Sequence, residues 1–155
     1  MTLLSTTAMS GSATVTLSSI STAYNKLYII VRDFYPSGTT AQFSVYCNGY
    51  NASNSYYGYT MGSRDGFSAN NPMTNNSGWN ITNNWSSYMK NTDNDSILIM
   101  EFPDYTQTST RKLVNWMVTG LNDGSNNVTQ MGVGRFDYTQ AISSISFNTN
   151  NGTLS

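Results

Sequence analysis

Histidine is absent from the 155-residue sequence, and cysteine and glutamate each occur once, as Cys47 and Glu101. Without histidine the chain has no Ser-His-Asp or Cys-His catalytic arrangement and no histidine-based metal site. A single cysteine also excludes a disulfide within the chain, and we expect Cys47 to be a small buried side chain in the alternating segment 42–47. No glycine-rich motif followed by lysine is present to hold a phosphate. These absences argue against an enzyme and predict neither a metal nor another cofactor.

Charged side chains are also scarce: they make up 10% of the chain and give a net charge of −1. An average soluble domain carries roughly 25% charged residues. Since no run of lysine and arginine occurs, the sequence predicts neither a nucleic-acid partner nor binding to an acidic membrane. The polar surface must come from Asn, Ser, Thr, Gln and Tyr, which hydrate well but repel neighbouring molecules weakly. Such a surface is typical of proteins that crowd side by side in capsids, fibres or surface layers.

No targeting or membrane segment is recognisable in the chain. The first twelve residues lack a basic region and a continuous apolar core, so we do not expect a secretory signal. Nothing approaches the ~18 consecutive apolar residues of a membrane span. Glycosylation-type triplets, among them those at Asn51, Asn80 and Asn127, arise from the high content of Asn, Ser and Thr alone. The length fits one domain covering residues 1–155.

Apolar residues alternate with polar ones at a period of two, which is typical of β-strands, and no segment has the 3.6-residue period of a helix. Turn residues interrupt the pattern, for example at Pro36-Ser-Gly38 and Asn122-Asp-Gly124. Gly132 and Gly134, in a strand-like region, indicate a bulge or a close approach to the backbone. About eight strands at such spacing favour a single-domain antiparallel β-sandwich, jelly-roll-like, over alternating strands and helices. The expected strands are Leu3–Thr7, Thr14–Ser18, Lys26–Phe34, Gln42–Cys47, Ile97–Phe102, Leu113–Thr119, Val128–Tyr138 and Ala141–Phe147.

Residues 48–94 differ from the rest as a long insertion, which we expect to be loop-rich within the sandwich. This segment holds most of the asparagines together with several Tyr and Trp residues. Flat aromatic rings flanked by amides suit the recognition of sugars or contacts with other proteins. The alternative is that these rings cap the core of the sandwich beneath the insertion. The candidate binding residues are Tyr56, Tyr57, Tyr59, Trp79, Trp85 and Tyr88.

Two groups of polar residues have a chemical interpretation as well as a structural one. Glu101 and Asp104 are candidates for the carboxylate pair of a glycosidase, although acids at the end of a strand more often form turns. Asn91, Asp93 and Asp95 have the alternate spacing of a calcium loop, but the glycine and the distal glutamate of such a loop are missing. We therefore interpret both groups as turns next to strands.

Several short blocks of structural residues occur in a fixed order along the chain. They are Ile20, Tyr24 and Leu27 after a Thr/Ser-rich opening, Asn48-Gly49 followed by Tyr56-Tyr57, Ile97 with Glu101-Phe-Pro-Asp-Tyr105, Thr108 and Lys112, and Ala141–Ile145. In this set the chain resembles a family of small virion structural proteins of marine phages, especially phages of cyanobacteria. The resemblance covers most of the chain and implies a sandwich fold without catalytic residues.

The resemblance implies a virion protein without catalytic residues, and we expect a structural protein on the exterior of the phage particle, present in many copies or as a homo-oligomer. The expected partners are the major capsid protein or tail proteins, without nucleic acid and without insertion into a membrane. We expect a capsid decoration protein or a small appendage, because the chain lacks the long repetitive shaft of trimeric fibres. The alternatives are a tail-fibre or receptor-binding module that recognises host surface glycans, and a glycan hydrolase. Members of the family continue beyond the equivalent of Leu154-Ser155, so we expect a final strand to be missing here or supplied by a partner.

Overall fold

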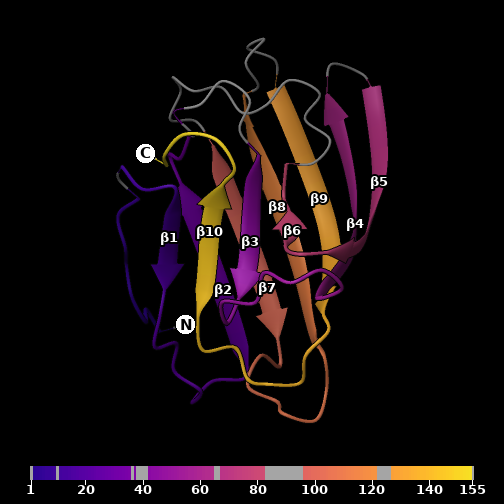
Figure 1. Ribbon diagram of the computed structural model, residues 1–155. Helices are drawn as coiled ribbons and strands as arrows, with labels where there is room; N and C mark the ends of the chain where they lie inside the picture. The colour runs from indigo at the N-terminus through magenta and orange to yellow at the C-terminus, as the bar shows by residue number, and fades with distance from the viewer. Residues whose placement is uncertain are drawn as a thin grey trace.

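Two antiparallel β-sheets, of four and six strands, pack face to face as a sandwich in the computed structural model of the chain (Figure 1). The structure describes residues 2–9, 11–35, 37, 42–64, 67–82, 96–121 and 127–154, and no helix occurs in these ranges. The all-β sandwich that the period-two pattern predicts is therefore confirmed.

The smaller sheet contains, in order, β1 (Thr14–Leu17), β10 (Ile145–Thr149), β3 (Phe43–Cys47) and β6 (Trp79–Asn80). Inward and outward side chains alternate along β3 and β10, and the inward ones are almost completely buried. Cys47 is one of these inward residues, as predicted, and its burial raises the pKa of the thiol. The edge strand β6 has only two residues.

The larger sheet contains, in order, β2 (Lys26–Arg32), β7 (Ile97–Pro103), β8 (Lys112–Leu121), β9 (Asn127–Phe136), β4 (Tyr56–Arg64) and β5 (Phe67–Asn76). Its β4–β5 end extends past the edge of the smaller sheet (Figure 1). The edge strand β5 contains Pro72, which lies opposite Tyr59 of β4. A jelly roll has eight strands in two sheets, so the orders of four and six strands do not confirm that topology.

Most of the expected strands are present, and one is not. The predictions for residues 14–18, 26–34, 42–47, 97–102, 113–119 and 128–138 correspond to β1, β2, β3, β7, β8 and β9. Leu3–Thr7 was expected to form a strand as well, but its residues are outside any sheet. Leu3 is 82% exposed, so no buried apolar face holds this segment against the sandwich.

The last expected strand, Ala141–Phe147, begins only at Ile145. The residues before it are held by Asn48, whose Oδ1 accepts hydrogen bonds from the backbone N–H groups of Ser143 and Ser144 at 2.8 and 3.1 Å. Because these N–H groups bind a side chain, they are not available to the ladder of a sheet.

Residues 48–94 are not the loop-rich insertion that we expected, because they contain β4, β5 and β6. Strand β4 pairs with β9 on one side and with β5 on the other. The sequences of β4 and β5 are rich in Gly, Asn, Ser and Thr and have no regular apolar alternation. Pairing with β4 therefore fixes the Asn-rich β5 as a strand against its low propensity, whereas the tyrosines of β4 favour a strand by themselves.

Two tryptophans fill the space between the sheets at the centre of the core. Trp79 of β6 and Trp116 of β8 are almost completely buried, with ring centroids 6.4 Å apart. Trp79 also donates a hydrogen bond from Nε1 to the Tyr57 carbonyl at 3.1 Å. Both rings lie against β9, where a Cβ added at Gly132 or Gly134 would overlap them. The two glycines therefore mark a close approach to the backbone, which is one of the two interpretations given by the sequence.

A buried lysine ties together two connections at one end of the larger sheet. Lys112 begins β8 and is 1% exposed. Its Nζ donates hydrogen bonds to the backbone carbonyls of Gln107, Thr110 and Thr139, the last two at 2.7 and 2.9 Å. Desolvation lowers the pKa of Lys112, whereas the three carbonyl oxygens favour its protonated form. The lysine thus satisfies backbone acceptors before β8 and after β9.

We expect Gly134→Ala to lower the free energy of unfolding by about 1–3 kcal/mol, because the new methyl group overlaps closely packed indole rings. Urea denaturation followed by tryptophan fluorescence measures the change. Asn127→Thr, at an exposed position of the same strand, is the control and is expected to stay within about 0.5 kcal/mol. Equal stability of the two variants would show that the rings can move away from β9.

Lys112→Met is expected to lower the free energy of unfolding by about 2–4 kcal/mol, because three backbone carbonyls lose a charged donor. Thermal unfolding followed by circular dichroism provides the measurement. In the control, Lys26→Met, an exposed ion pair with Glu101 is lost, and we expect a melting temperature close to that of the unmodified chain. A Lys112→Met protein as stable as the Lys26→Met protein would contradict the structural role of this lysine.

Candidate functional site

Two of the six predicted binding residues lie in the core. Tyr56 and Trp79 are completely buried, and their rings meet edge to face with centroids 4.9 Å apart. The Tyr56 hydroxyl donates a hydrogen bond to the Tyr50 carbonyl and accepts one from the Cys47 backbone N–H, both at 2.7 Å. Burial raises the pKa of Tyr56. These two residues are therefore core residues rather than surface binding residues, since their rings fill the space between the sheets.

Tyr57 and Tyr59 point away from the core, on the outer face of the larger sheet. The Arg135 guanidinium lies 4.7 Å from the centroid of the half-buried Tyr57 ring. Tyr59 is 38% exposed. Trp85 and Tyr88 lie outside the described residues. Of the candidates that the structure describes, two are thus inside the sandwich and two are on its surface.

Glu101 and Asp104 have separate roles in the structure. Lys26 Nζ lies 2.7 Å from Glu101 Oε1, and its hydrogen bond lowers the pKa of this carboxyl group. Asp104 adopts a left-handed conformation with φ of 50°, and its carbonyl accepts a hydrogen bond from the Gln107 N–H at 3.1 Å. The general acid of a glycosidase needs a raised pKa, so Glu101 is poorly suited to that role.

Metal ligands do not gather in the part of the chain that the structure describes. No group of three or more His, Cys, Asp or Glu side chains with the arrangement of a metal site occurs there. The segment with the alternate spacing of a calcium loop, residues 91–95, lies outside the described residues.

The outer face of the larger sheet carries a continuous line of apolar side chains, here called the apolar row. Each of five neighbouring strands contributes one apolar residue, and the register of the sheet places each of these residues directly opposite the one on the adjacent strand. Four of these side chains are 38–55% exposed, and the fifth, Ile99, is partly buried. The apolar row consists of Ile30 (β2), Ile99 (β7), Met117 (β8), Met131 (β9) and Met61 (β4).

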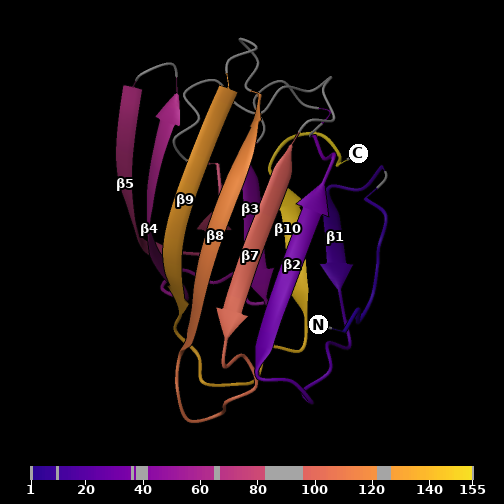
Figure 2. The same cartoon turned by 180° about the vertical axis from the view of Figure 1, so that it is seen from behind.

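Further large apolar side chains flank the apolar row on the same face. Tyr28, Val133 and Tyr59 lie in the next line of register, together with Glu101 and Asn115. Figure 2 views the molecule from this side, and no described segment covers the six strands. An antiparallel sheet with one face in water normally has polar side chains on that face. The larger sheet instead has an apolar inner face and a largely apolar outer face.

Apart from Arg32 at the end of β2, the charged groups described on this face form ion pairs within the chain. Lys26 binds Glu101, and Arg135 Nε lies 3.0 Å from Asp137 Oδ1. Arg111 Nε contacts the same carboxylate oxygen at 2.5 Å. The apolar row itself contains no charged residue. The middle of this face is therefore apolar and uncharged, and the ionised groups beside the apolar row carry a small excess of positive charge.

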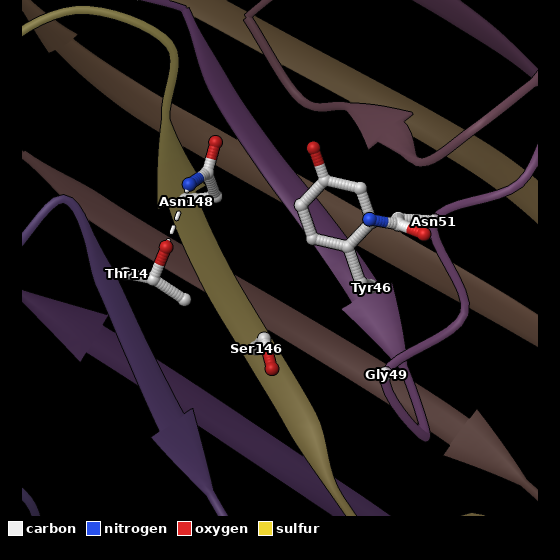
Figure 3. A pocket seen from close by; sticks show the side chains of 6 residues that line it. All are labelled: Thr14, Tyr46, Gly49, Asn51, Ser146 and Asn148. Carbon is white, nitrogen blue, oxygen red and sulfur yellow. Dashed lines mark hydrogen bonds between the residues drawn. The ribbon is translucent and has the colours of Figure 1, made fainter.

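A shallow groove lies on the opposite side of the sandwich, on the outer face of the smaller sheet (Figure 3). Its volume is about 370 Å³. Asn148 Nδ2 donates a hydrogen bond to Thr14 Oγ1 at 2.7 Å, so these two side chains are held in place. An aromatic ring beside amides and hydroxyls suits contacts with sugars. The groove is lined by Thr14, Tyr46, Gly49, Asn51, Ser146 and Asn148.

The sequence analysis identified neither the apolar row nor the groove. A signal for the apolar row exists, because β7, β8 and β9 have apolar residues at outward as well as inward positions. The row itself depends on the register between strands that are distant in the sequence, which no single segment encodes. The groove likewise joins β1, β3 and β10 from the two ends of the chain.

No helix among the described residues is long and apolar enough to cross a membrane. Comparisons of the chain with protein-family models, curated proteins and solved structures found no match. The assignment of a function therefore rests on the residues and the geometry of the chain itself.

Proposed function

We propose that the chain is a non-enzymatic structural protein on the exterior of a bacteriophage particle, either a capsid decoration protein or a small appendage. The observation that carries this proposal is the apolar outer face of the larger sheet. Monomeric soluble proteins rarely expose contiguous apolar patches larger than a few hundred Å². Such a face is suited to permanent burial against another subunit of the particle, and the partners of the assembled protein are the major capsid protein or tail proteins.

Two features of the sequence support the same proposal. Charged residues make up 10% of the chain, so identical or related subunits can lie side by side with little repulsion. The ordered blocks, among them Glu101–Tyr105 and Ala141–Ile145, resemble those of small virion proteins of marine phages and cyanophages. The lack of histidine and the ion pair of Glu101 support a role without catalysis.

Purified particles of the phage that encodes the chain are expected to contain the protein in many copies. Mass spectrometry of gradient-purified particles measures its presence, and antibody labelling in electron micrographs locates it. We expect label on the head if the chain is a decoration protein. Label on the tail alone would identify the chain as a small appendage protein instead. Particles that lack the protein would contradict the proposed function.

A second candidate function is the recognition of host surface glycans by a receptor-binding or tail-fibre module. The groove on the smaller sheet favours it, because the Tyr46 ring lies there beside the amides of Asn51 and Asn148. The exposed Tyr59 lies on the opposite side of the sandwich, on the larger sheet. If glycans bind, we therefore place the site at the groove.

Binding of the chain to an array of host surface glycans tests this second function. We expect Tyr46→Ala and Asn51→Ala to remove any such binding, because each truncates a side chain that lines the groove. Met131→Ala, on the opposite face, is the matched control and is expected to bind as the unmodified chain does. Binding that persists in both groove variants would assign it to another surface.

A further inference from the structure

The apolar row has no partner within the described chain, although it crosses five of the six strands of the larger sheet. We infer that two copies of this chain pack face to face through the outer faces of their larger sheets, with the apolar row of each copy at the centre of the contact. This inference rests on the proposed function, which makes the face a contact surface, and deepens it by naming the partner as a second copy.

The exposed apolar area matches the requirement of a stable dimer. Tyr28, Tyr59, Leu113 and Val133 are exposed beside the members of the apolar row. Together, the large apolar side chains of this face expose an area on the order of 800 Å². A standard-size interface buries about 800 Å² on each partner. The face is therefore large enough for a specific dimer without a contribution from other parts of the chain.

The spacing between the strands of a second, identical sheet also matches the spacing between the strands of this face. Facing sheets pack about 10 Å apart, and their side chains interdigitate between strands that are about 4.8 Å apart. A second copy presents lines of side chains with the same spacing. Met61, Met117 and Met131 have unbranched, flexible side chains, which fill the irregular gaps between two twisted surfaces.

The distribution of charge permits contact between two copies. Lys26 and Glu101 neutralise each other, and Asp137 binds both Arg111 and Arg135. A strongly charged partner would find no run of unpaired charges of one sign among these groups. The apolar row at the centre of the contact is uncharged, so two identical faces can meet there without burying a charge.

The symmetry of such a dimer identifies the residue at its centre. Contact between two identical faces is isologous, and side chains on the two-fold axis meet their own copies. Met117 is the middle member of the apolar row, on the third of its five strands. An axis through the centre of the row therefore places Met117 against the same residue of the second copy.

Sedimentation velocity of the purified chain, from micromolar to near-millimolar concentrations, tests the inference. The unmodified chain is expected to dimerise, and Met131→Lys to raise the dissociation constant about tenfold or more, because each dimer would bury two uncompensated ammonium groups. Thr16→Lys places the same charge on the exposed side of β1 in the smaller sheet and is expected to dimerise normally. An unmodified chain that stays monomeric, or a Met131→Lys chain that dimerises as well as the control, would overturn the inference.

A second measurement locates the axis. Met117→Cys is expected to form covalent dimers with a short bis-maleimide, whereas Thr16→Cys is not. The natural thiol of Cys47 is buried and does not compete for the reagent. Dimers that form equally with Thr16→Cys, or in neither variant, would contradict a contact centred on Met117.

The results also separate this inference from the proposed function. Suppose that the chain is monomeric and is incorporated into phage particles, and that the Met131→Lys variant is not incorporated. The face would then bind another virion protein, so the inference would be wrong and the proposed function would be supported. A dimeric chain that is absent from purified particles would overturn the proposed function, while the contact between copies would be supported.

Discussion

The packing of Trp79 and Trp116 against the glycines of β9 is the contact on which the arrangement of the two sheets depends. Gly132 and Gly134 have no side chains, so the indole rings occupy the space that inward residues of β9 would otherwise fill. In a strand, a residue fixed on the inner face fixes its neighbours on the outer face. The inward glycines therefore also determine that Met131 points away from the core, between Gly132 and Gln130 in the sequence.

The two outer faces of the sandwich have different chemistry, and this difference separates their roles. The outer face of the smaller sheet carries hydroxyls, amides and the Tyr46 ring, all of which water can solvate. The outer face of the larger sheet carries the apolar row, which water solvates poorly. A contact that buries the outer face of the larger sheet therefore leaves the outer face of the smaller sheet in the solvent.

The fold was predictable from the sequence where inward and outward residues differ clearly, as in Gln42–Cys47 and Ile97–Phe102. The strand state of β4 and β5 was not, because neither has a regular apolar alternation and each depends on a neighbouring strand, β4 on β9 and β5 on β4. The candidate site was harder still to predict. The sequence around Trp79 does not indicate whether its ring lies on the surface or in the core. The apolar row can be recognised only from the register of five strands.

The edge strands of the two sheets affect whether crowded copies of the chain can aggregate by pairing strand to strand. Pro72 lacks an N–H group, so it interrupts the donors that edge strand β5 could present to a further strand. The edge strand β6 presents only two residues, and β2 carries Lys26 and Arg32 at its ends. Addition of strands at an open edge can continue without limit and leads to amyloid-like aggregates. These three edges therefore oppose the continued addition of strands when many copies of the chain are crowded together.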